Sequence, residues 1–394
     1  MLILVCNAGS TSLKYKLFKM PEEKVLSTGK IERIGDAKKG IYAFKNCVTG
    51  EEKNADGIDI MTYTDGINLY LSDLAGEGKV ISSISELSAV GFKTVVAKGY
   101  YGVHIITDDV MDAMKEYIDI APAHNTFYIE AINTFRKILP DTTMVGVFET
   151  NFHRTIPDYA RIYATPYEWY EKDGICRLGF HGASHGYIAY RTTQMFGEGK
   201  KVISCHLGGS SSICAIKDGK SVETSFGMSL QTGLPHSNRV GDMDAFAIVR
   251  QLSLGKSMKE IEHALNKESG LLGISGVSKD MRDIDKAAKE GNKRAALAID
   301  FFCHEVKKFI GAYAASMGGV DYIVFTAGIG EKSVSVREKS LSGLEFLGVV
   351  LDKEKNASGE AEREISSFDS KVKVFIIPTD EEIIVARQTF STVN

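Results

Sequence analysis

Residues 204–218 read SCHLGGSSSICAIKD, with two glycines and three serines set between two apolar runs. The run at 202–205 and the run at 213–216 predict two strands joined by this loop. Asp218-Gly219 follows the second run, and this pair is preferred in tight hairpin turns, so a third strand is expected over 222–225. We therefore expect an antiparallel meander with a glycine-serine loop at one end.

The same strand-loop-strand pattern occurs near the start of the chain, where residues 5–17 read VCNAGSTSLKYKL. Cys, Gly and Ser recur there with the same spacing, about half a chain earlier. Backbone N–H groups of a glycine loop can approach an anion closely, and hydroxyl groups add further donors. Either loop alone would suit an ordinary hairpin turn. The repetition favours a duplicated phosphate-binding device, one in each half of the chain.

The bulk composition describes a soluble globular protein. A chain of 394 residues is long enough for two domains. The formal net charge of −4 argues against nucleic-acid and membrane-surface partners, which favour a basic face. No apolar stretch approaches the roughly 18 residues of a membrane span, and the N-terminus does not resemble a secretion signal. The six cysteines form no CxxC pair and the histidines no HExxH, so we expect free thiols in the cytoplasm and no zinc site.

A third glycine segment lies in the second half. Apolar residues over 295–317 predict a helix that ends at Gly318-Gly319, and 322–325 reads as a buried strand. Gly328-Ile329-Gly330 follows that strand and is expected to form a loop, with a helix opening near Ser333. The N-terminus of such a helix favours the binding of an anion. A planar nucleobase can lie against the glycine backbone, which has no side chains.

The C-terminal segment predicts a strand and then a helix. Residues 372–377 are apolar and Pro378 stops the run. A helix is expected from about Asp380, with Thr379 and Glu382 forming a capping box. This arrangement would occupy Glu382 and leave Glu381 for another role.

Nine ordered segments carry a resemblance over nearly the whole chain. They are NAGSTSLKYKLF (7–18), APAHN (121–125), NFHRTIP (151–157), PYEWYEKDGICRLGFHGASH (166–185), HLGGSSSICAIKDGKSVETS (206–225), NRVGDMD (238–244), GISGVSKDMRDI (273–284), FTAGIGE (325–331) and IPTDEE (377–382). Together they resemble the acetate/propionate kinase family of the sugar kinase and actin superfamily.

The resemblance implies an α/β fold with two duplicated ribonuclease H-like (actin-like ATPase) domains and a nucleotide cleft between them. The N-terminal domain would comprise residues 1–147 and the C-terminal helix 378–394. The other domain, residues 148–377, would bind the nucleotide and form a homodimer.

The resemblance also implies roles for individual residues. The catalytic residues would be Glu149, His181 and Arg239. Asn7 and Glu381 would hold Mg²⁺ (or Mn²⁺). The acid would contact Lys93, Ala123, Phe180 and Leu230. ATP or ADP would contact Lys14, His206, Leu207, Gly208, Gly209, Ser210, Asp280, Met281, Arg282, Gly328, Ile329, Gly330, Glu331 and Lys332.

Elementary chemistry supports two of these roles independently. Phosphoryl transfer depends on positioning and charge stabilisation more than on covalent help. Arg239 lies in the polar segment SNRVGD, where its planar fork can contact two phosphoryl oxygens, although a surface salt bridge would also suit it. His181 is flanked by Phe180 and Gly182, which leaves backbone open around it, and a buried hydrogen-bonded histidine is the alternative.

Three departures from the family pattern matter, and two of them concern the acid. The segment GFKTVVAKGYYG (91–102) has Phe92 and Lys93 where the family has a histidine and an arginine, with Lys98 as another nearby cation. Glu149 stands in place of an aspartate, and Gly209 in place of an asparagine. A lysine keeps the positive charge but cannot contact a carboxylate as a two-pronged fork does.

Three functions remain in competition. The leading one is phosphoryl transfer between ATP and a short-chain acid, acetate first and propionate second, giving an acyl phosphate. A nucleotide-binding sensor that has lost the acid site is the second. The third is a serine hydrolase, because GASHG (182–186) matches the G-x-S-x-G pattern around Ser184, which would need a strand immediately before it.

Overall fold

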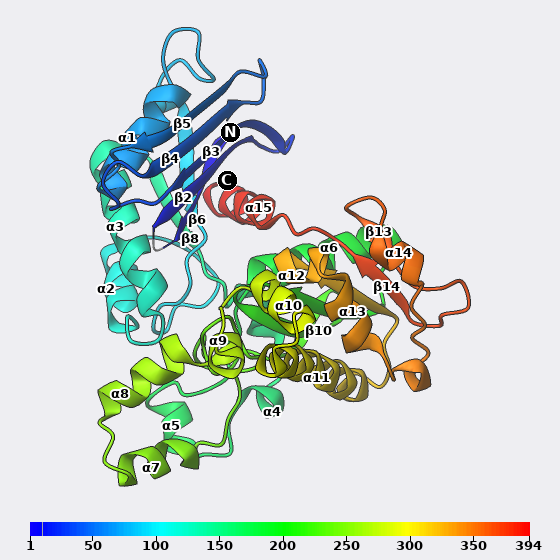
Figure 1. Ribbon diagram of the computed structural model, residues 1–394. Helices are drawn as coiled ribbons and strands as arrows, with labels where there is room; N and C mark the ends of the chain where they lie inside the picture. Colours follow the sequence, from blue (N-terminus) through cyan, green and yellow to red (C-terminus); the bar gives the residue numbers. More distant parts are fainter. Residues whose placement is uncertain (10) are drawn as a thin grey trace. The chain divides into compact units, whose positions relative to one another are not determined.

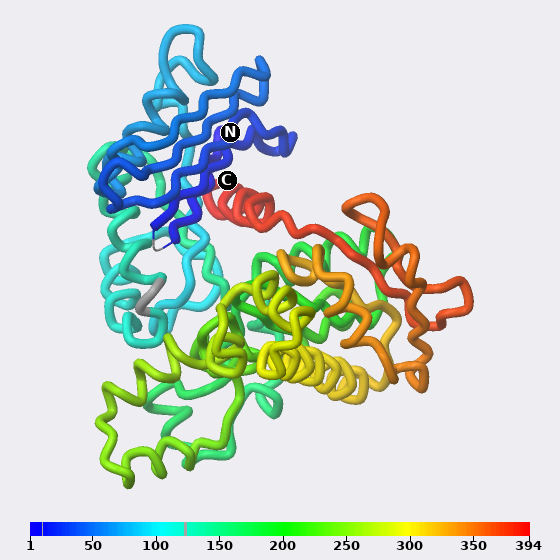
Figure 2. The backbone as a smooth tube through the Cα atoms, in the orientation of Figure 1, coloured from blue at the N-terminus to red at the C-terminus, as the bar shows by residue number. Residues whose placement is uncertain are grey.

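The computed structural model describes residues 1–9 and 11–394, apart from the side chains of Pro122 and Ala123. The chain forms two compact units, each with its own sheet (Figures 1 and 2). Unit 1 comprises residues 1–151 and 380–394, and unit 2 comprises residues 152–379. Within the described residues, no helix combines the length and the apolar character needed to cross a membrane.

Unit 1 contains an eight-stranded sheet in the order β5-β4-β3-β2-β1-β6-β8-β7. Its strands are β1 Leu2–Gly9, β2 Ser12–Lys19, β3 Lys24–Glu32, β4 Gly40–Asn46, β5 Glu52–Ile58, β6 Leu87–Phe92, β7 Val103–Ile105 and β8 Thr143–Val147. Strands β1 to β5 form an antiparallel meander, and β1, β6 and β8 run parallel. The predicted N-terminal hairpin is confirmed, because β1 pairs with β2.

Helices cover both faces of this sheet. They are α1 Tyr63–Leu74, α2 Asp108–Glu116, α3 Pro122–Ile138 and α15 Glu381–Val393, with the single turn η1 Ile84–Glu86. Phe92 at the end of β6 packs edge-on against Phe135 of α3, with ring centroids 5.6 Å apart. The preceding residue, Gly91, faces α15. Because successive strand residues point to opposite faces, α3 and α15 lie on opposite sides of the sheet.

Gly91 lets α15 approach β6 closely. A Cβ atom there would lie 2.2 Å from Thr389 Oγ1 and 3.1 Å from Val385 Cγ1. We expect Gly91→Ala to destabilise unit 1 by about 1–3 kcal/mol, as overpacking of a filled interior does. Thermal melting followed by circular dichroism measures the effect. Gly311→Ala is the control, because nothing lies within 4 Å of its added methyl group and alanine favours its helix. Equal melting temperatures for the two variants would contradict the expectation.

Unit 2 repeats the strand pattern of unit 1. Its sheet has the order β11-β10-β9-β12-β14-β13. The strands are β9 Lys201–Leu207, β10 Ser211–Lys217, β11 Lys220–Thr224, β12 Tyr322–Thr326, β13 Arg363–Glu364 and β14 Lys373–Ile376. In each unit the first three strands pair antiparallel, and two later strands continue the sheet parallel to the first, namely β6 and β8 or β12 and β14. The predicted fold class, α/β with two similarly built sheets, is confirmed.

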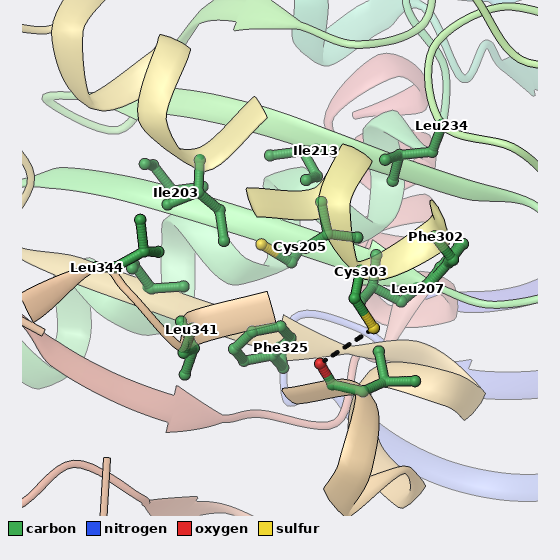
Figure 3. Close-up of a cluster of buried hydrophobic side chains, with 14 of the residues drawn as sticks. Ile203, Cys205, Leu207, Ile213, Leu234, Phe302, Cys303, Phe325, Leu341 and Leu344 are labelled. Atoms are coloured by element: carbon green, nitrogen blue, oxygen red, sulfur yellow. Dashed lines mark hydrogen bonds between the residues drawn. The ribbon is translucent and has the colours of Figure 1, made fainter. Parts of the chain in front are cut away.

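Two helices sandwich the sheet of unit 2. The helices of this unit are α4 Asp158–Arg161, α5 Tyr167–Glu171, α6 Gly182–Phe196, α7 Phe246–Ser253, α8 Met258–His263, α9 Gly270–Ser275, α10 Met281–Lys289, α11 Lys293–Ser316, α12 Ala327–Lys332, α13 Val334–Leu341 and α14 Lys353–Ala357. The 3₁₀ turns η2 Asn151–Thr155 and η4 Glu345–Leu347 and the π-helical turn η3 Ala264–Glu268 complete the set. Ile203, Cys205 and Leu207 of β9 join Phe302 of α11 in one buried cluster (Figure 3). The alternate residue Val202 packs with α6 on the other face.

Two local predictions are wrong. Gly328-Ile329-Gly330 lies within the helix α12, which begins directly after β12, although Ser333 does cap the next helix as expected. The capping box at the C-terminal helix is absent: Asp380 caps α15 by accepting a hydrogen bond from the Ile383 N–H at 3.2 Å. Glu382 forms an ion pair with Lys16 of β2 instead, at 3.3 Å.

Candidate functional site

A cavity of about 970 Å³ opens in unit 2 beside the second glycine-serine loop. The loop between β9 and β10, the start of α10, and the pair α12 and α13 supply its walls. The lining residues are Gly208, Gly209, Ser237, Asn238, Lys279, Asp280, Met281, Arg282, Asp285, Lys289, Gly328, Ile329, Lys332, Ser333, Val334, Ser335 and Glu338. The volume is in the range of sites that enclose small molecules and cofactors.

The walls combine bare backbone with charged side chains. A Cβ atom added at Gly328 would meet nothing within 4 Å, so this glycine leaves open space. A Cβ at Gly209 would lie 3.2 Å from Ser237 Oγ. Arg282 donates two hydrogen bonds to the carboxylate of Asp280, which lower the pKa of Asp280 to about 2. This wall therefore has an ion pair next to glycine backbone. A flat ligand can approach that backbone closely because the glycines have no side chain.

A buried arginine holds α12 in place. Arg337 is fully buried and donates hydrogen bonds to the carbonyl oxygens of Gly330 and Glu331, at 2.8 and 3.0 Å. It also donates to Asn356 Oδ1 at 2.7 Å. These bonds satisfy the carbonyl groups at the end of a helix that is only six residues long. At its start, Ala327 has φ +64°, a strained conformation for a residue with a side chain.

The cavity gathers many of the predicted nucleotide residues. Eight of them line it: Gly208, Gly209, Asp280, Met281, Arg282, Gly328, Ile329 and Lys332. Six others are outside this lining: Lys14, His206, Leu207, Ser210, Gly330 and Glu331. Leu207 is fully buried in the core cluster, so its side chain faces away from any ligand. Lys14 belongs to unit 1, where it lines a shallow cavity of about 310 Å³ on the meander.

Arg239 presents a largely buried guanidinium close to the same loop. Its Nη2 donates a hydrogen bond to Ser210 Oγ at 2.6 Å. Burial lowers the pKa of Arg239 to about 10, so it stays charged near neutral pH. Within the described part of the chain, no carboxylate lies in ion-pair contact with it. Because a buried unpaired charge is costly, this arrangement is suited to an incoming anion.

His181 belongs to a chain of imidazole and hydroxyl groups. It occupies the N-cap position of α6 in the left-handed conformation, with φ +57°, which is uncommon for a residue with a side chain. Ser212 Oγ lies 2.8 Å from both His181 Nδ1 and His185 Nε2. Ser204 Oγ lies 2.8 Å from His185 Nδ1. Since the Ser212 hydroxyl has one proton, it donates to one histidine and accepts from the other, which couples their tautomers.

The surroundings of His181 keep it in a fixed orientation. Burial lowers the pKa of His185 well below its ordinary value, so this neighbour is neutral. The ring of His206 stacks on His181 at 4.0 Å, and Phe226 packs against it edge-on.

The predicted apolar residues of unit 2 are buried, and Phe180 is linked to this cluster through Phe226. Phe180 is 1% exposed and meets Phe226 edge-on, with centroids 5.4 Å apart, and Leu230 is 7% exposed. The side chain of Ala123, the third predicted apolar contact, lies outside the described residues. The serine hydrolase alternative fails, because Ser184 is fully buried in the first turn of α6 and no strand lies immediately before it in the described chain.

Unit 1 holds a second cluster of charged groups. Lys93 Nζ lies 2.6 Å from Glu381 Oε2 and 3.4 Å from Glu149 Oε1. Burial alone would lower the pKa of Lys93, but Glu149 and Glu381 raise it well above its ordinary value. The cation is therefore held firmly between two carboxylates. Lys98 lies elsewhere, in an exposed ion pair with Glu116.

Asn7 lies next to this cluster because of the sheet topology. Lys93 N–H donates to the carbonyl of Cys6 at 3.2 Å, and Glu149 N–H to that of Thr94 at 2.9 Å. The ends of the parallel strands β1, β6 and β8 thus bring these groups together, as the carboxyl ends of parallel strands commonly do for ligands. Tyr128 of α3 donates a hydrogen bond to Asn7 Oδ1 at 3.0 Å.

The donors in unit 1 suit a hard divalent cation. Within the described residues, no three His, Cys, Asp or Glu side chains converge to hold an ion by themselves. Glu381 and Asn7 offer carboxylate and amide oxygens, and Mg²⁺ commonly uses one or two carboxylates together with substrate phosphates. The ammonium group of Lys93 at 2.6 Å from Glu381 shows that this carboxylate already accepts a cation.

Sequence reasoning missed several groups in both clusters. Ser212, His185 and Ser204 connect to His181, and Tyr128 to Asn7. One signal was present: His181 and His185 are four residues apart, which places them on one face of a helix. The serine partners lie on other strands, so no local pattern could identify them.

Three comparisons place the chain among known proteins. The model of the acetokinase family matches residues 2–387. An acetate kinase from Clostridium botulinum is 48% identical over 99% of this chain and 98% of its own length. The crystal structure of Porphyromonas gingivalis acetate kinase matches with a TM-score of 0.86 and 38% identity over 100% of both chains. That of a propionate kinase from Francisella tularensis matches with a TM-score of 0.88 and 36% identity over 98% of both chains.

Proposed function

The chain belongs to the acetokinase family, and from this premise we propose that it transfers a phosphoryl group between ATP and acetate. The products are acetyl phosphate and ADP, and the reaction runs in both directions. Propionate is the second candidate acid, because a propionate kinase shares the fold over 98% of both chains.

Unit 2 binds the nucleotide in this proposal. The 970 Å³ cavity has the size and the glycine-rich walls that an adenosine phosphate requires. Lys279, Lys289 and Lys332 bring positive charge to its rim. The backbone of the β9–β10 loop, with Gly208 and Gly209, faces the phosphates, and α12 with Gly328 lies against the nucleoside. His206, Leu207, Ser210, Gly330 and Glu331 contribute through the backbone and hydroxyl groups of the same two segments, and Lys14 is proposed as a further cation for the phosphates.

Arg239 and His181 stabilise the phosphoryl group during its transfer. That group spreads negative charge over three oxygens, and rigid donors that meet this charge lower the barrier. Arg239 contributes a charged fork, oriented by its hydrogen bond to Ser210. His181 contributes its imidazole ring, which the contact between its Nδ1 and Ser212 holds in place.

The acid is held by one cation and several apolar side chains. We propose Lys93 as the anchor for the carboxylate and Phe180, Leu230 and Ala123 as contacts of the alkyl end. Glu149, 5% exposed, is a buried carboxylate next to Lys93 that orients the acyl group.

Asn7 and Glu381 hold Mg²⁺, or Mn²⁺, in this scheme. Such an ion neutralises phosphate charge when it is bound. Glu381 supplies a carboxylate at the N-terminus of α15, and Asn7 supplies an amide oxygen whose orientation is fixed by Tyr128.

The domains, assembly and compartment follow the family pattern. We propose an N-terminal domain of residues 1–147 with 378–394, a second domain of residues 148–377, a homodimer formed by the second domain, and a cytoplasmic location. Large apolar side chains are exposed on or next to α4, α5, α7 and α8, which supports an interface there. They include Tyr159, Tyr167, Phe246, Val249, Leu254 and Met258. Free cysteines, five of the six buried, suit a reducing compartment.

One observation carries the proposal most strongly: a charged, largely buried Arg239 without a carboxylate partner in the described chain stands next to a glycine-serine loop. The test is a hydroxamate assay for acyl phosphate with acids of one to five carbons and several phosphoryl donors. We expect acetyl hydroxamate with ATP, less propionyl hydroxamate, and none from longer acids. Binding of ATP without acyl phosphate from any acid would indicate the sensor function instead.

A further inference from the structure

Lys93 lies between two carboxylates, and its partners suggest more than a static anchor. The side chains of Lys93, Glu381 and Glu149 are 15%, 15% and 6% exposed. Both carboxylates contact the same ammonium group. Its shortest contact, 2.6 Å, joins Lys93 Nζ to Glu381.

The two carboxylates beside Lys93 oppose the binding of an acid there. The carboxylate of a substrate that approached Lys93 would also face Glu381 and Glu149. Like charges repel strongly where water is excluded, and a buried charge needs a partner of its own. Lysine offers three donors on one point charge, and the structure places its strongest contact on Glu381. While that ion pair persists, Lys93 is a poor anchor for a third carboxylate.

Glu381 has an alternative partner within reach. It is a metal ligand in the function proposed above, together with Asn7, and it lies in the first turn of α15. A divalent cation competes well with an ammonium group for a carboxylate, because it carries twice the charge and prefers oxygen ligands. When Glu381 contacts such a cation, Lys93 loses its closest partner.

We propose that Lys93 is a switchable anchor, held by Glu381 in the metal-free protein and released to the carboxylate of the acid when Glu381 coordinates a divalent cation. This inference rests on the proposed function and adds an order to it. Binding of the cation strengthens binding of the acid, and by linkage the acid strengthens binding of the cation by the same factor.

The first experiment measures acetate binding to the unaltered protein without nucleotide. The probe is ¹³C-labelled acetate followed by saturation-transfer NMR, with and without Mg²⁺ added as the chloride. We expect Mg²⁺ to tighten acetate binding by about tenfold or more. Equal affinity in both conditions would overturn the proposal.

Variants separate the switch from a direct contact between metal and acetate. Glu381→Gln keeps the shape and removes the charge that holds Lys93, so we expect acetate to bind without Mg²⁺ about as well as it binds the unaltered protein with Mg²⁺. Lys93→Met should abolish acetate binding in both conditions. Glu382→Gln is the matched control, because its carboxylate pairs with Lys16, and it should keep the dependence on Mg²⁺ of the unaltered protein.

The outcomes distinguish this inference from the function on which it rests. If Glu381→Gln does not bind acetate in the absence of metal, the switch is overturned. This conclusion requires that the circular dichroism spectrum of the variant match that of the unaltered protein. If that variant does not fold, the Mg²⁺ dependence of the unaltered protein and Lys93→Met decide. If the protein forms acetyl phosphate but binds acetate equally well with and without Mg²⁺, the proposed function stands and the switch is rejected. No acyl phosphate from any acid rejects the function, and the switch with it.

Discussion

Arg239→Ala is expected to lower kcat by about 10²–10³, with a much smaller rise in KM for ATP. The guanidinium is charged, largely buried and hydrogen-bonded to Ser210 at 2.6 Å, so its direction is set before substrate arrives. A donor that is fixed in advance contributes most where charge develops, which is on the phosphoryl group during transfer. Removing it should therefore act on the chemical step.

Arg282→Ala is the matched control for Arg239→Ala. Arg282 also belongs to the cavity wall, but its side chain is 90% exposed and paired with Asp280. We expect this variant to raise KM for ATP and to leave kcat within about threefold. Steady-state rates over a range of ATP concentrations separate the two results. An unchanged kcat in Arg239→Ala would remove Arg239 from the mechanism.

His181→Ala should lower kcat by a similar factor, about 10²–10³. The residue adopts a strained backbone conformation, stacks on His206 and is joined to His185 through Ser212. Strain that the surrounding structure maintains is a frequent property of functional residues. The alanine variant should bind ATP nearly as well as the unaltered protein.

Ser212→Ala tests whether that chain of hydrogen bonds positions His181. Without the hydroxyl group the ring keeps its stacking partner but loses the bond that fixes its Nδ1, so we expect kcat to fall by about tenfold with KM for ATP unchanged. His263→Ala is the control, because His263 is 63% exposed and pairs with Glu268. An Ser212→Ala variant with the kcat of the unaltered protein would show that stacking alone orients the ring.

The hairpins were predictable because their information is local. Alternation of apolar and polar residues indicates a strand, and Asp218 and Gly219 adopt the positive φ values, +52° and +73°, that a tight two-residue turn needs. Both features lie within a few residues of each other. The repeat between the halves appears again as the shared order of three antiparallel and two parallel strands.

The helix α12 was not predictable from its own residues. Two glycines in six positions disfavour a helix, and the segment was expected to form a loop. The carbonyl groups of Gly330 and Glu331 are satisfied by Arg337, which is itself fixed by Asn356, so tertiary contacts outweigh local preference. Nothing near the segment in sequence indicates this.

The pairing of Lys93 was not predictable for a similar reason. The sequence suggested a cation for the acid, but it could not show that Glu149 and Glu381 lie against it. Glu381 is 288 residues away along the chain. The capping prediction failed in the same way, because Lys16 engages Glu382 from β2.

The last helix of the chain has a consequence for how the protein is made. Unit 1 needs α15, which covers the face of β6 that contains Gly91, yet α15 consists of residues 381–393. During translation the ribosome therefore finishes every residue of unit 2 before it delivers the helix that completes unit 1. Until then one apolar face of the first sheet is uncovered and open to chaperones or to aggregation. A premature stop codon at position 380 would leave unit 2 whole and make that exposure permanent.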